Sequence, residues 1–390
     1  MNILLVHNRY RQAGGEDTVV QHEQSLLASN GHTVTLLEAD NADIGGAFSA
    51  AATAGRAIYS GAARRRVREA IQCRQPDIVH VHNFFPQFSP SIYSACRDAG
   101  VPVVQTLHNY RLLCPNALFF RDGHACEDCM GKMVPWPGVL HACYRASRLA
   151  TVPVAAMLSV HRALRTWAEN VDVYIALTEF AREKFVEGGL PAEKIIVKPN
   201  FVHPAPEPGT GRGGYALFVG RLSEEKGVRT LLAAWDQMPV SIRLKIAGDG
   251  PLAAGVKAAA ERDSGIEWLG EVSRDSVVEL MQEASVLIFP SVWYEGFPMA
   301  IVEAFAVGLP VIASNIGSMS SLIQHGRTGL HFRAADAADL ARQVEWASTR
   351  SSELLQMRVH ARREFDENYT APRNYELLTD IYRRASASVR

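Results

Sequence analysis

The chain of 390 residues carries 40 Lys and Arg against 41 Asp and Glu, so its formal net charge is −1. A near-neutral total argues against a protein that coats nucleic acid through its overall field. A content of 47% apolar and 21% charged residues excludes a disordered chain. No stretch approaches the ~20 apolar residues that span a bilayer, and the length favours two domains of about 100–200 residues.

The first eight residues contain an apolar run that no basic segment precedes. Such a start is typical of a buried first strand rather than of a signal peptide. We therefore expect a cytoplasmic protein, in which disulfides are rare.

In the first half of the chain, short apolar runs alternate with amphipathic stretches. The expected strands cover 3–6, 34–37, 78–81, 103–107 and 173–176, and the expected helices cover 18–29, 64–73 and 91–99. Continuous Val, Ile and Leu runs are typical of parallel strands that are covered on both faces. The alternation predicts an α/β fold with a parallel sheet.

A proline- and glycine-rich segment, 200–214, interrupts this pattern and favours an inter-domain linker. A second series follows, with strands at 216–219, 244–247, 266–269, 286–289 and 311–313 and helices at 228–237, 277–284 and 299–306. We expect an N-terminal domain over 1–200 with a cysteine-rich insert at 110–145, a second domain over 201–370, and a final helix over 371–390.

Three motifs follow strands of the second domain, where open α/β sheets place ligands. Arg221 and Lys226 lie in the loop after the first strand, and a guanidinium with an ammonium suits a diphosphate. Taken alone, this loop fits a solvated charged segment equally well. A turn at 248–251, Gly-Asp-Gly-Pro, ends the next strand and is weak evidence by itself.

The third motif surrounds the start of the helix at 299–306. Glu295 precedes the helix and Glu303 lies within it, eight residues later, among apolar neighbours. Between them, backbone N–H groups near Gly296, Phe297, Pro298 and Met299 can bind phosphate at the helix N-terminus. An acid here can also bind the vicinal hydroxyls of a sugar, although Glu303 could instead face solvent.

Together, the Arg-x4-Lys and Glu-x7-Glu spacings and the 248–251 turn resemble retaining glycosyltransferases of family 4, the glycosyl transferases group 1. The resemblance covers essentially the whole chain. It implies the GT-B fold, with two Rossmann-like domains facing across a cleft, and a hexosyltransferase activity in bacterial surface polysaccharide assembly. The substrates it implies are a UDP- or GDP-linked sugar donor and a glycan or lipid-linked acceptor, bound by the first domain.

The resemblance also implies roles for single residues. Arg221 and Lys226 should hold the donor diphosphate and stabilise the leaving group, Glu303 should bind the ribose, and Glu295 should contact the transferred sugar. The last helix, from about Tyr375 to Ala385, should cross back to the first domain. The reaction would be a front-side displacement, in which the leaving phosphate oxygen takes the acceptor proton.

In the first domain, Gly14 and Gly15 open the first helix and allow close backbone approach to phosphate. The resemblance implies that such a pair lies beside the donor phosphates or the acceptor. A plain turn explains this pair equally well. His108 ends the strand 103–107, where the family often has a histidine near the transferred sugar. Most members continue with Asp, whereas this chain has Asn109, so a role for an acid at that position is in doubt. His82 could reach an acceptor, and we expect His80 to be packed.

No Asp-x-Asp motif follows a strand, so we predict catalysis without a divalent metal. Cys114, Cys126, Cys129 and Cys143 lie in an irregular segment and could form a tetrahedral structural zinc site. The alternative is four free thiols.

Six arginines against one Glu lie between 56 and 74, and with Arg145, Arg148, Arg162 and Arg165 they could dock the first domain on anionic lipid at the inner membrane face. A solvated helix face is the alternative. Two other functions stay open: a metal- or redox-responsive binding protein built on the cysteines, and a GT-B nucleotide-sugar epimerase. We expect no nucleic-acid partner.

Overall fold

The computed structural model describes residues 1–9, 15–41, 55–238 and 243–388. The chain divides into two compact units. Unit 1 comprises Met1–Phe119, Cys126–Asn200 and Asn374–Arg390, and unit 2 comprises Phe120–Ala125 and Phe201–Arg373. Each unit is built on a six-stranded sheet of parallel strands, so the predicted α/β class is confirmed.

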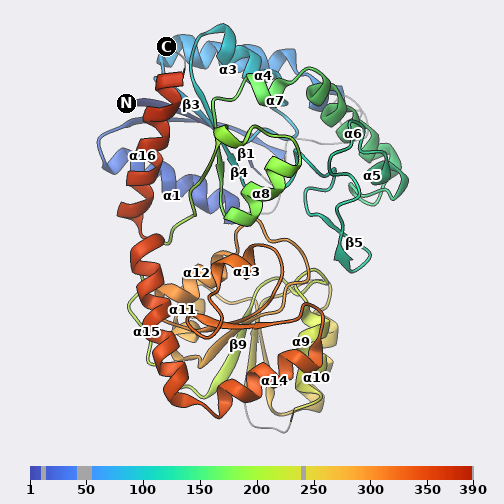
Figure 1. The fold of residues 1–390 in the computed structure, drawn as a ribbon, viewed down its shortest axis with the longest axis vertical. Coiled ribbons are helices and arrows are strands. Elements are labelled where there is room, and N and C mark those ends of the chain that lie inside the picture. Colours follow the sequence, from blue (N-terminus) through green and yellow to red (C-terminus); the bar gives the residue numbers. More distant parts are fainter. Residues whose placement is uncertain (10–14, 42–54, 239–242, 389–390) are drawn as a thin grey trace. The chain divides into compact units, whose positions relative to one another are not determined.

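The sheet of unit 1 has the strand order β2-β1-β3-β4-β7-β8. Its strands are β1 (Asn2–Arg9), β2 (Thr33–Asp40), β3 (Ile78–Asn83), β4 (Val103–Leu107), β7 (Val173–Ala176) and β8 (Ile195–Val197). The helices are α1 (Gly15–Ser29), α3 (Gly61–Arg74), α4 (Ser91–Asp98), α5 (Trp136–Leu140), α6 (Arg148–Ala163), α7 (Thr166–Glu169) and α8 (Glu179–Glu187). Within this unit, α1 covers one face of the sheet, and α3 and α4 cover the other (Figure 1).

Unit 2 has the order β11-β10-β9-β12-β13-β14. Its strands are β9 (Tyr215–Val219), β10 (Arg243–Ala247), β11 (Ile266–Gly270), β12 (Val286–Phe289), β13 (Val311–Ser314) and β14 (Gly329–Phe332). The helices are α9 (Val228–Trp235), α10 (Ala253–Arg262), α11 (Arg274–Glu283), α12 (Met299–Ala306), α13 (Ser318–Leu322), α14 (Ala337–Ser348) and α15 (Ser351–Asn368). A short hairpin, β5 (Phe120–Arg121) and β6 (His124–Ala125), groups with this unit.

Alternating strand residues divide the core of unit 2 into two layers. Leu217 and Leu287 pack with Ile301 of α12 and Phe365 of α15. The residues that point the other way pack with α9, α10 and α14. A parallel strand covered on both faces must be apolar on both, which is why these strands read as continuous apolar runs.

The last helix, α16 (Ala371–Ser388), contributes most of its length to unit 1. Its Tyr382 is fully buried there, and the hydroxyl lies 2.8 Å from Nδ1 of His80. Near the start of the same helix, the Asn374 amide donates to the Pro199 carbonyl at 2.9 Å. The end of the chain is therefore part of the first sheet's core.

Candidate functional site

The loops that leave the carboxyl ends of β9, β10 and β12 pack against one another in unit 2. The Gly248 backbone has φ +141°, and a Cβ there would lie 2.0 Å from the Gly220 carbonyl oxygen. Gly227 has φ +71°, and a Cβ there would lie 1.8 Å from the Pro290 oxygen. Only glycine permits this approach. The 248–251 turn thus serves to pack the loop that carries Arg221 and Lys226.

Strands β9 and β12 are neighbours at the point where the chain order of this sheet reverses. A reversal of this kind is where open α/β sheets bind ligands. Arg221 and Lys226 follow β9, and Glu295 follows β12. The structure therefore brings these three predicted residues to one place on the sheet edge.

Lys226 and Glu295 form an ion pair, with Nζ 2.7 Å from Oε1. The same oxygen accepts hydrogen bonds from the Ser291 hydroxyl at 2.7 Å and from the Trp293 indole at 2.9 Å. Glu295 is buried, whereas the Lys226 side chain is 25% exposed and lies over the Trp293 ring, 5.5 Å from its centroid. The ammonium is held in place by the carboxylate and remains open to a ligand.

Arg221 is exposed, and its guanidinium forms no ion pair among the residues that the structure describes. A cation without an acidic partner at a switch point is available to an anionic ligand.

Glu303 lies inside α12 and is only partly exposed. Burial raises the pKa of its carboxyl, and Arg274, whose Nη2 lies 3.8 Å from Oε1, opposes that shift. A partly buried carboxyl at a sheet edge can accept hydrogen bonds from a ligand's hydroxyl groups.

Helix α12 starts directly after Gly296, Phe297 and Pro298, and its first residue is Met299. Pro298 is the N-cap residue, and no side chain caps the helix. The first-turn N–H groups are therefore not bonded by a capping side chain, as anion binding at a helix start requires.

In unit 1, His108 follows β4, and its Nε2 lies 3.0 Å from Nδ1 of His82 on the neighbouring strand β3. The rings stack with centroids 5.3 Å apart. Burial, aided by the charges of His7 and Lys198, lowers the pKa of His108 to about 3. His108 is therefore a neutral imidazole near pH 7.

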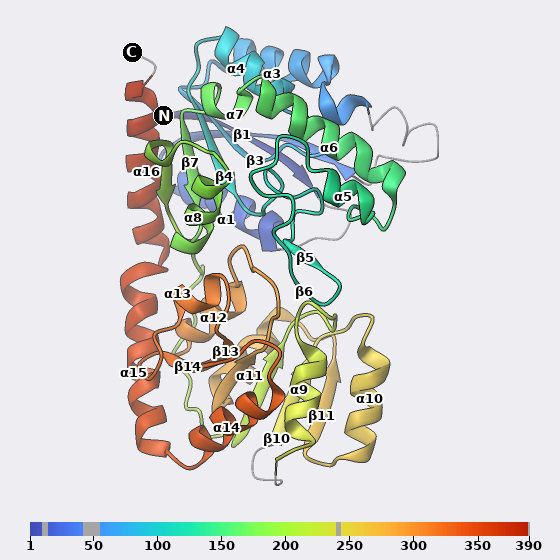
Figure 2. The same ribbon diagram turned by 45° about the vertical axis from the view of Figure 1, so that its right-hand side comes forward.

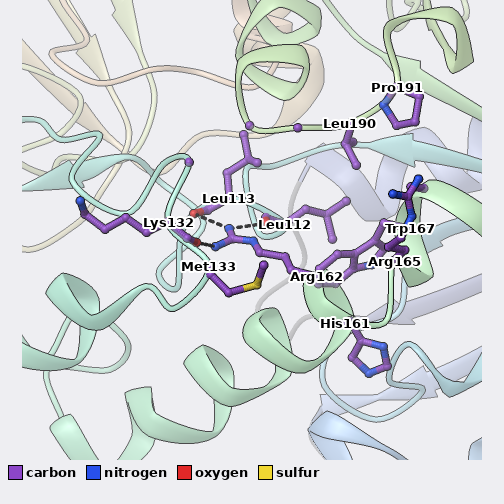
Figure 3. Close-up of a pocket in the computed structure, with 14 residues that line it drawn as sticks. Leu112, Leu113, Lys132, Met133, His161, Arg162, Arg165, Trp167, Leu190 and Pro191 are labelled. Carbon is purple, nitrogen blue, oxygen red and sulfur yellow. Dashed lines mark hydrogen bonds between the residues drawn. The ribbon is translucent and has the colours of Figure 1, made fainter.

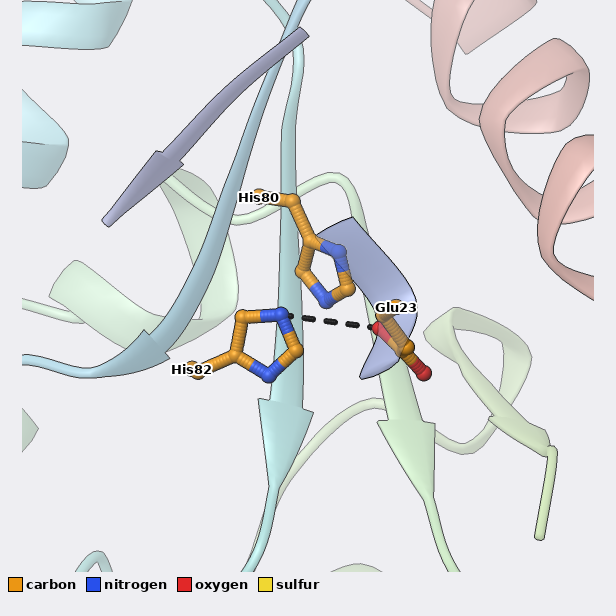
Figure 4. Close-up of side chains that lie close together, drawn as sticks. All are labelled: Glu23, His80 and His82. Atoms are coloured by element: carbon orange, nitrogen blue, oxygen red, sulfur yellow. Dashed lines mark ion pairs between the residues drawn. The ribbon is translucent and has the colours of Figure 1, made fainter. Parts of the chain in front are cut away.

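Two buried charged residues, which were not among the predicted site residues, support this histidine pair. Lys198, directly after β8, is fully buried and lies 2.7 Å from the Glu23 carboxylate of α1. The second Glu23 oxygen lies 3.6 Å from Nε2 of His82 (Figure 4). Lys198 and Glu23 thus lie behind the His82–His108 pair, and the Glu23–His82 contact is electrostatic rather than a hydrogen bond.

Among the described residues, Glu23, His80 and His82 are the set of metal-type side chains whose ligand atoms lie within 4.8 Å of one another. The Lys198 ammonium already neutralises the Glu23 carboxylate. His80 has both ring nitrogens engaged, by Tyr382 and Thr106 at 2.8 Å each. We therefore interpret the cluster as an internal polar network, and His80 is packed, as the sequence indicates.

Helix α1 starts at Gly15, whereas Gly14 lies outside the described residues. Two residues into the helix, the Asp17 carboxylate lies 2.8 Å from Nε2 of His7, at the end of β1. The beginning of this helix therefore contacts the same sheet edge on which His82 and His108 lie.

None of the six cysteines, all of them described, is in a disulfide. Of the four in the insert, Cys114 and Cys129 are buried, and Cys126 and Cys143 are partly buried. Burial raises the pKa of Cys129 to about 12. The four cysteines are not among the sets with ligand atoms within 4.8 Å in the described part of the chain.

A pocket of about 340 Å³ lies in unit 1, and its lining includes Arg162 and Arg165 of the predicted basic patch (Figure 3). Arg162 crosses it and donates to the carbonyls of Leu112 at 3.0 Å, Leu113 at 3.3 Å and Lys132. This arginine holds the insert against α6, so its charge serves the fold.

Two family models match successive parts of the chain. "Glycosyltransferase Family 4" matches residues 13–205, and "Glycosyl transferases group 1" matches residues 213–349. The chain belongs to the family 4 glycosyltransferases. The predicted family is confirmed, and a metal-responsive binding protein or an epimerase is not favoured.

Curated relatives of this glycosyltransferase are distant. The α-maltose-1-phosphate synthase of Mycolicibacterium smegmatis is 27% identical over 57% of this chain and 66% of its own. The amylovoran biosynthesis glycosyltransferase AmsK of Erwinia amylovora is 26% identical over 56% of this chain and 58% of its own. The chain thus matches less than two thirds of the length of either relative.

Among solved structures, Anabaena HepE in complex with UDP superposes with a TM-score of 0.70 at 15% identity, over 97% of this chain and 99% of that one. This likeness shows the fold, two Rossmann-like domains with parallel sheets of the GT-B type. The predicted GT-B fold is therefore confirmed.

Proposed function

We propose that this glycosyltransferase moves a sugar from a nucleotide-sugar donor to a glycan or lipid-linked acceptor, with retention of configuration, in the assembly of a surface polysaccharide. The observation that carries the proposal is the Lys226–Glu295 pair at the β9–β12 switch point, together with an exposed Arg221 that no described acid pairs. The polysaccharide context is supported by the amylovoran enzyme among the relatives.

In the proposed reaction, the acceptor hydroxyl oxygen bonds to the anomeric carbon while the bond from that carbon to the phosphate oxygen breaks. The acceptor proton passes to the leaving phosphate oxygen on the same face of the sugar, so the configuration is retained. Arg221 and Lys226 stabilise the charge that develops on the nucleoside diphosphate. Glu295 holds Lys226 in position and contacts the transferred sugar.

The remaining predicted residues take supporting roles in this proposal. Glu303 binds the ribose hydroxyls, and the start of α12, from Gly296 to Met299, binds the phosphates. Gly14 and Gly15 lie beside the donor phosphates. His108, as a neutral imidazole, exchanges hydrogen bonds with the transferred sugar and is oriented by His82. We propose no divalent metal in catalysis.

The choice of nucleotide is open to a direct screen of UDP- and GDP-linked sugars by thermal shift. The UDP in the Anabaena neighbour makes uridine nucleotides the first choice. Glu303→Ala should then abolish detectable donor binding in calorimetry. Glu279→Ala, a change of an exposed acid in α11, is the matched control. Unchanged donor affinity in Glu303→Ala would overturn the proposed role of Glu303.

We also propose that the insert binds a structural zinc ion through Cys114, Cys126, Cys129 and Cys143. Gly138 supports this grouping: its N–H and the Cys129 thiol both donate to the Pro135 carbonyl, at 3.2 and 3.8 Å, its own carbonyl accepts from Cys143 N–H at 2.9 Å, and it contacts Pro115, next to Cys114. Metal analysis of the purified protein should give one zinc per chain, and Cys129→Ser should lose it. Protein without bound zinc would refute this proposal.

We propose a cytoplasmic location, which is supported by six cysteines that form no disulfide among the described residues, because thiols stay reduced in that compartment. No described helix is both long and apolar enough to cross a membrane.

A further inference from the structure

One segment of unit 1 concentrates exposed apolar side chains. Twelve large apolar residues are exposed among those that the structure describes, and eight of them lie between 133 and 164. They are Met133, Val134, Trp136, Leu140, Leu149, Val152, Val160 and Leu164. The segment is about a tenth of the chain, so the concentration is local and needs a physical explanation.

The outward side of α6 carries three of this set, and a fourth, Leu164, follows the helix directly. At 100° per residue, the buried residues of the helix, such as Val154 and Leu158, occupy one half of its circumference. The other half holds Leu149, Val152 and Val160, and Leu149 is 88% exposed. A surface helix normally presents polar residues to water, whereas α6 is apolar on both sides.

Helix α5 and the loop before it supply the other half. Trp136 and Leu140 are on α5, and Met133 and Val134 precede it. Helices α5 and α6 are in contact and lie side by side in both ribbon views (Figures 1 and 2). The exposed apolar residues of the two helices therefore belong to one region of unit 1, which we call the α5–α6 face.

The charge of this face has a single sign. Residues 130–168 contain no Asp or Glu, but they contain Lys132, Arg145, Arg148, Arg162 and Arg165. Arg162 is held by backbone carbonyls and Arg165 pairs with Glu169 at 3.1 Å, while Lys132, Arg145 and Arg148 are exposed. Two copies of a face with this charge repel each other, so a second copy of the chain is a poor partner. A partner must be both apolar and anionic.

The arginines around α3 are less available to an anionic partner than the composition of that stretch indicates. Arg64 pairs with Asp98, and Arg66 donates to the Glu38 carbonyl at 2.6 Å and lies over the Phe88 ring. These contacts use part of the charge that the sequence offers there. The α5–α6 face combines exposed charge with exposed apolar area and so differs from the α3 stretch.

We propose that the α5–α6 face docks unit 1 on an anionic lipid bilayer. Leu, Val and Trp side chains would enter the boundary between headgroups and acyl chains, while the surrounding Lys and Arg bind anionic headgroups. The docking goes beyond the proposed transfer reaction and uses none of its residues.

Vesicle flotation tests the docking directly. Full-length protein should float with vesicles of phosphatidylethanolamine and phosphatidylglycerol, and much less with phosphatidylcholine alone. The triple variant Leu149→Ser, Val152→Ser, Val160→Ser should partition at least about tenfold more weakly, because it removes apolar area without a change of charge. Leu355→Ser with Val359→Ser, which are 64% and 63% exposed on α15, is the apolar control and should float like the wild type.

A second set of variants tests how much the positive charge of the face contributes to vesicle binding. Lys132→Gln with Arg145→Gln should weaken flotation about tenfold at low salt. Arg243→Gln with Lys257→Gln removes the same charge from exposed positions of unit 2 and should leave flotation unchanged. Circular dichroism and donor binding should be the same in every variant, which separates loss of docking from loss of fold or of donor binding.

Wild-type protein that does not float with anionic vesicles would overturn the proposal. So would a triple variant that floats as the wild type does, or control variants whose flotation falls as much as that of the variants of the α5–α6 face. Light scattering is a further test. If the wild type is a dimer and the triple variant is a monomer, the face joins two copies of the chain, and the lipid proposal is wrong.

Discussion

The carboxyl edges of the two sheets use charge in opposite ways. In unit 2, Arg221 is exposed and Lys226 is partly exposed. In unit 1, Lys198 and Glu23 are both fully buried and pair with each other behind His82. Charges that stay in contact with water can bind a ligand, whereas charges sealed in a core can only hold neighbouring groups in place. We therefore propose that the unit 2 edge binds an anion and that the unit 1 edge orients a neutral histidine.

The substitution with the largest expected effect is at the unit 2 edge. Glu295→Gln keeps an acceptor for Ser291 and Trp293 but removes the countercharge of Lys226. Because one preorganised charged contact is worth about 10²–10³ in turnover, we expect kcat to fall by about that factor in an assay of sugar transfer. Glu279→Gln is the control. A Glu295→Gln enzyme with wild-type kcat would show that the pair does not serve the reaction.

The buried Lys198–Glu23 pair at the unit 1 edge should contribute to the free energy of unfolding. Lys198→Met leaves the Glu23 carboxylate buried without its partner, which costs about 3–5 kcal/mol of unfolding free energy. In contrast, Asp236→Asn breaks the exposed pair with Arg262 and should cost about 1 kcal/mol or less. Urea denaturation measures both. The double variant Lys198→Met, Glu23→Leu should be more stable than Lys198→Met alone. If Lys198→Met and Asp236→Asn lower the unfolding free energy equally, the buried pair does not differ from an exposed one.

Substitutions at two glycines test whether close packing determines the conformation of the loops at the unit 2 edge. Gly227→Ala places a methyl group 1.8 Å from the Pro290 oxygen, while Gly214, at φ +66°, has open space around it. Both changes strain a left-handed backbone by about 1–2 kcal/mol. Only Gly227→Ala adds overpacking, so we expect a total cost of about 3 kcal/mol. Thermal or urea unfolding measures the difference, and equal losses would contradict the packing.

The smallest effect is a pH slope. Burial lowers the pKa of His80, His82 and His108, in the last case from 6.5 to about 3. Between these values the unfolded chain binds more protons, so the unfolding free energy should fall as the pH drops below about 6.5. His108→Gln should flatten the slope, and the exposed His203→Gln should not. A slope of the same size in His108→Gln would show that the buried histidine is not its source.

The sequence predicted the unit 2 edge better than the unit 1 edge, and the reason is physical. Arg221, Lys226 and Glu295 follow apolar strands directly, so the position of each residue on the sheet could be derived from strand order alone. Lys198 also follows a strand, β8, and the same rule could have found it, but a three-residue strand gives a weak pattern.

Glu23 could not be found in this way, because it lies in the middle of α1 and meets Lys198 175 residues later. Contacts of that range depend on which helix covers which strand. The same holds for Ser291 and Trp293, whose role at Glu295 depends on the local turn. The apolar outward side of α6 is readable in the sequence, but its exposure becomes known only from the fold.

The central claim is that the unit 2 edge binds the diphosphate of a nucleotide sugar. Calorimetric titration of UDP and GDP into the wild type, Lys226→Gln and the control Lys257→Gln tests it most directly. We expect the wild type and the control to bind one of the two nucleotides, and Lys226→Gln to bind it at least about tenfold more weakly. Equal affinity in all three proteins, or no binding of either nucleotide, would contradict it.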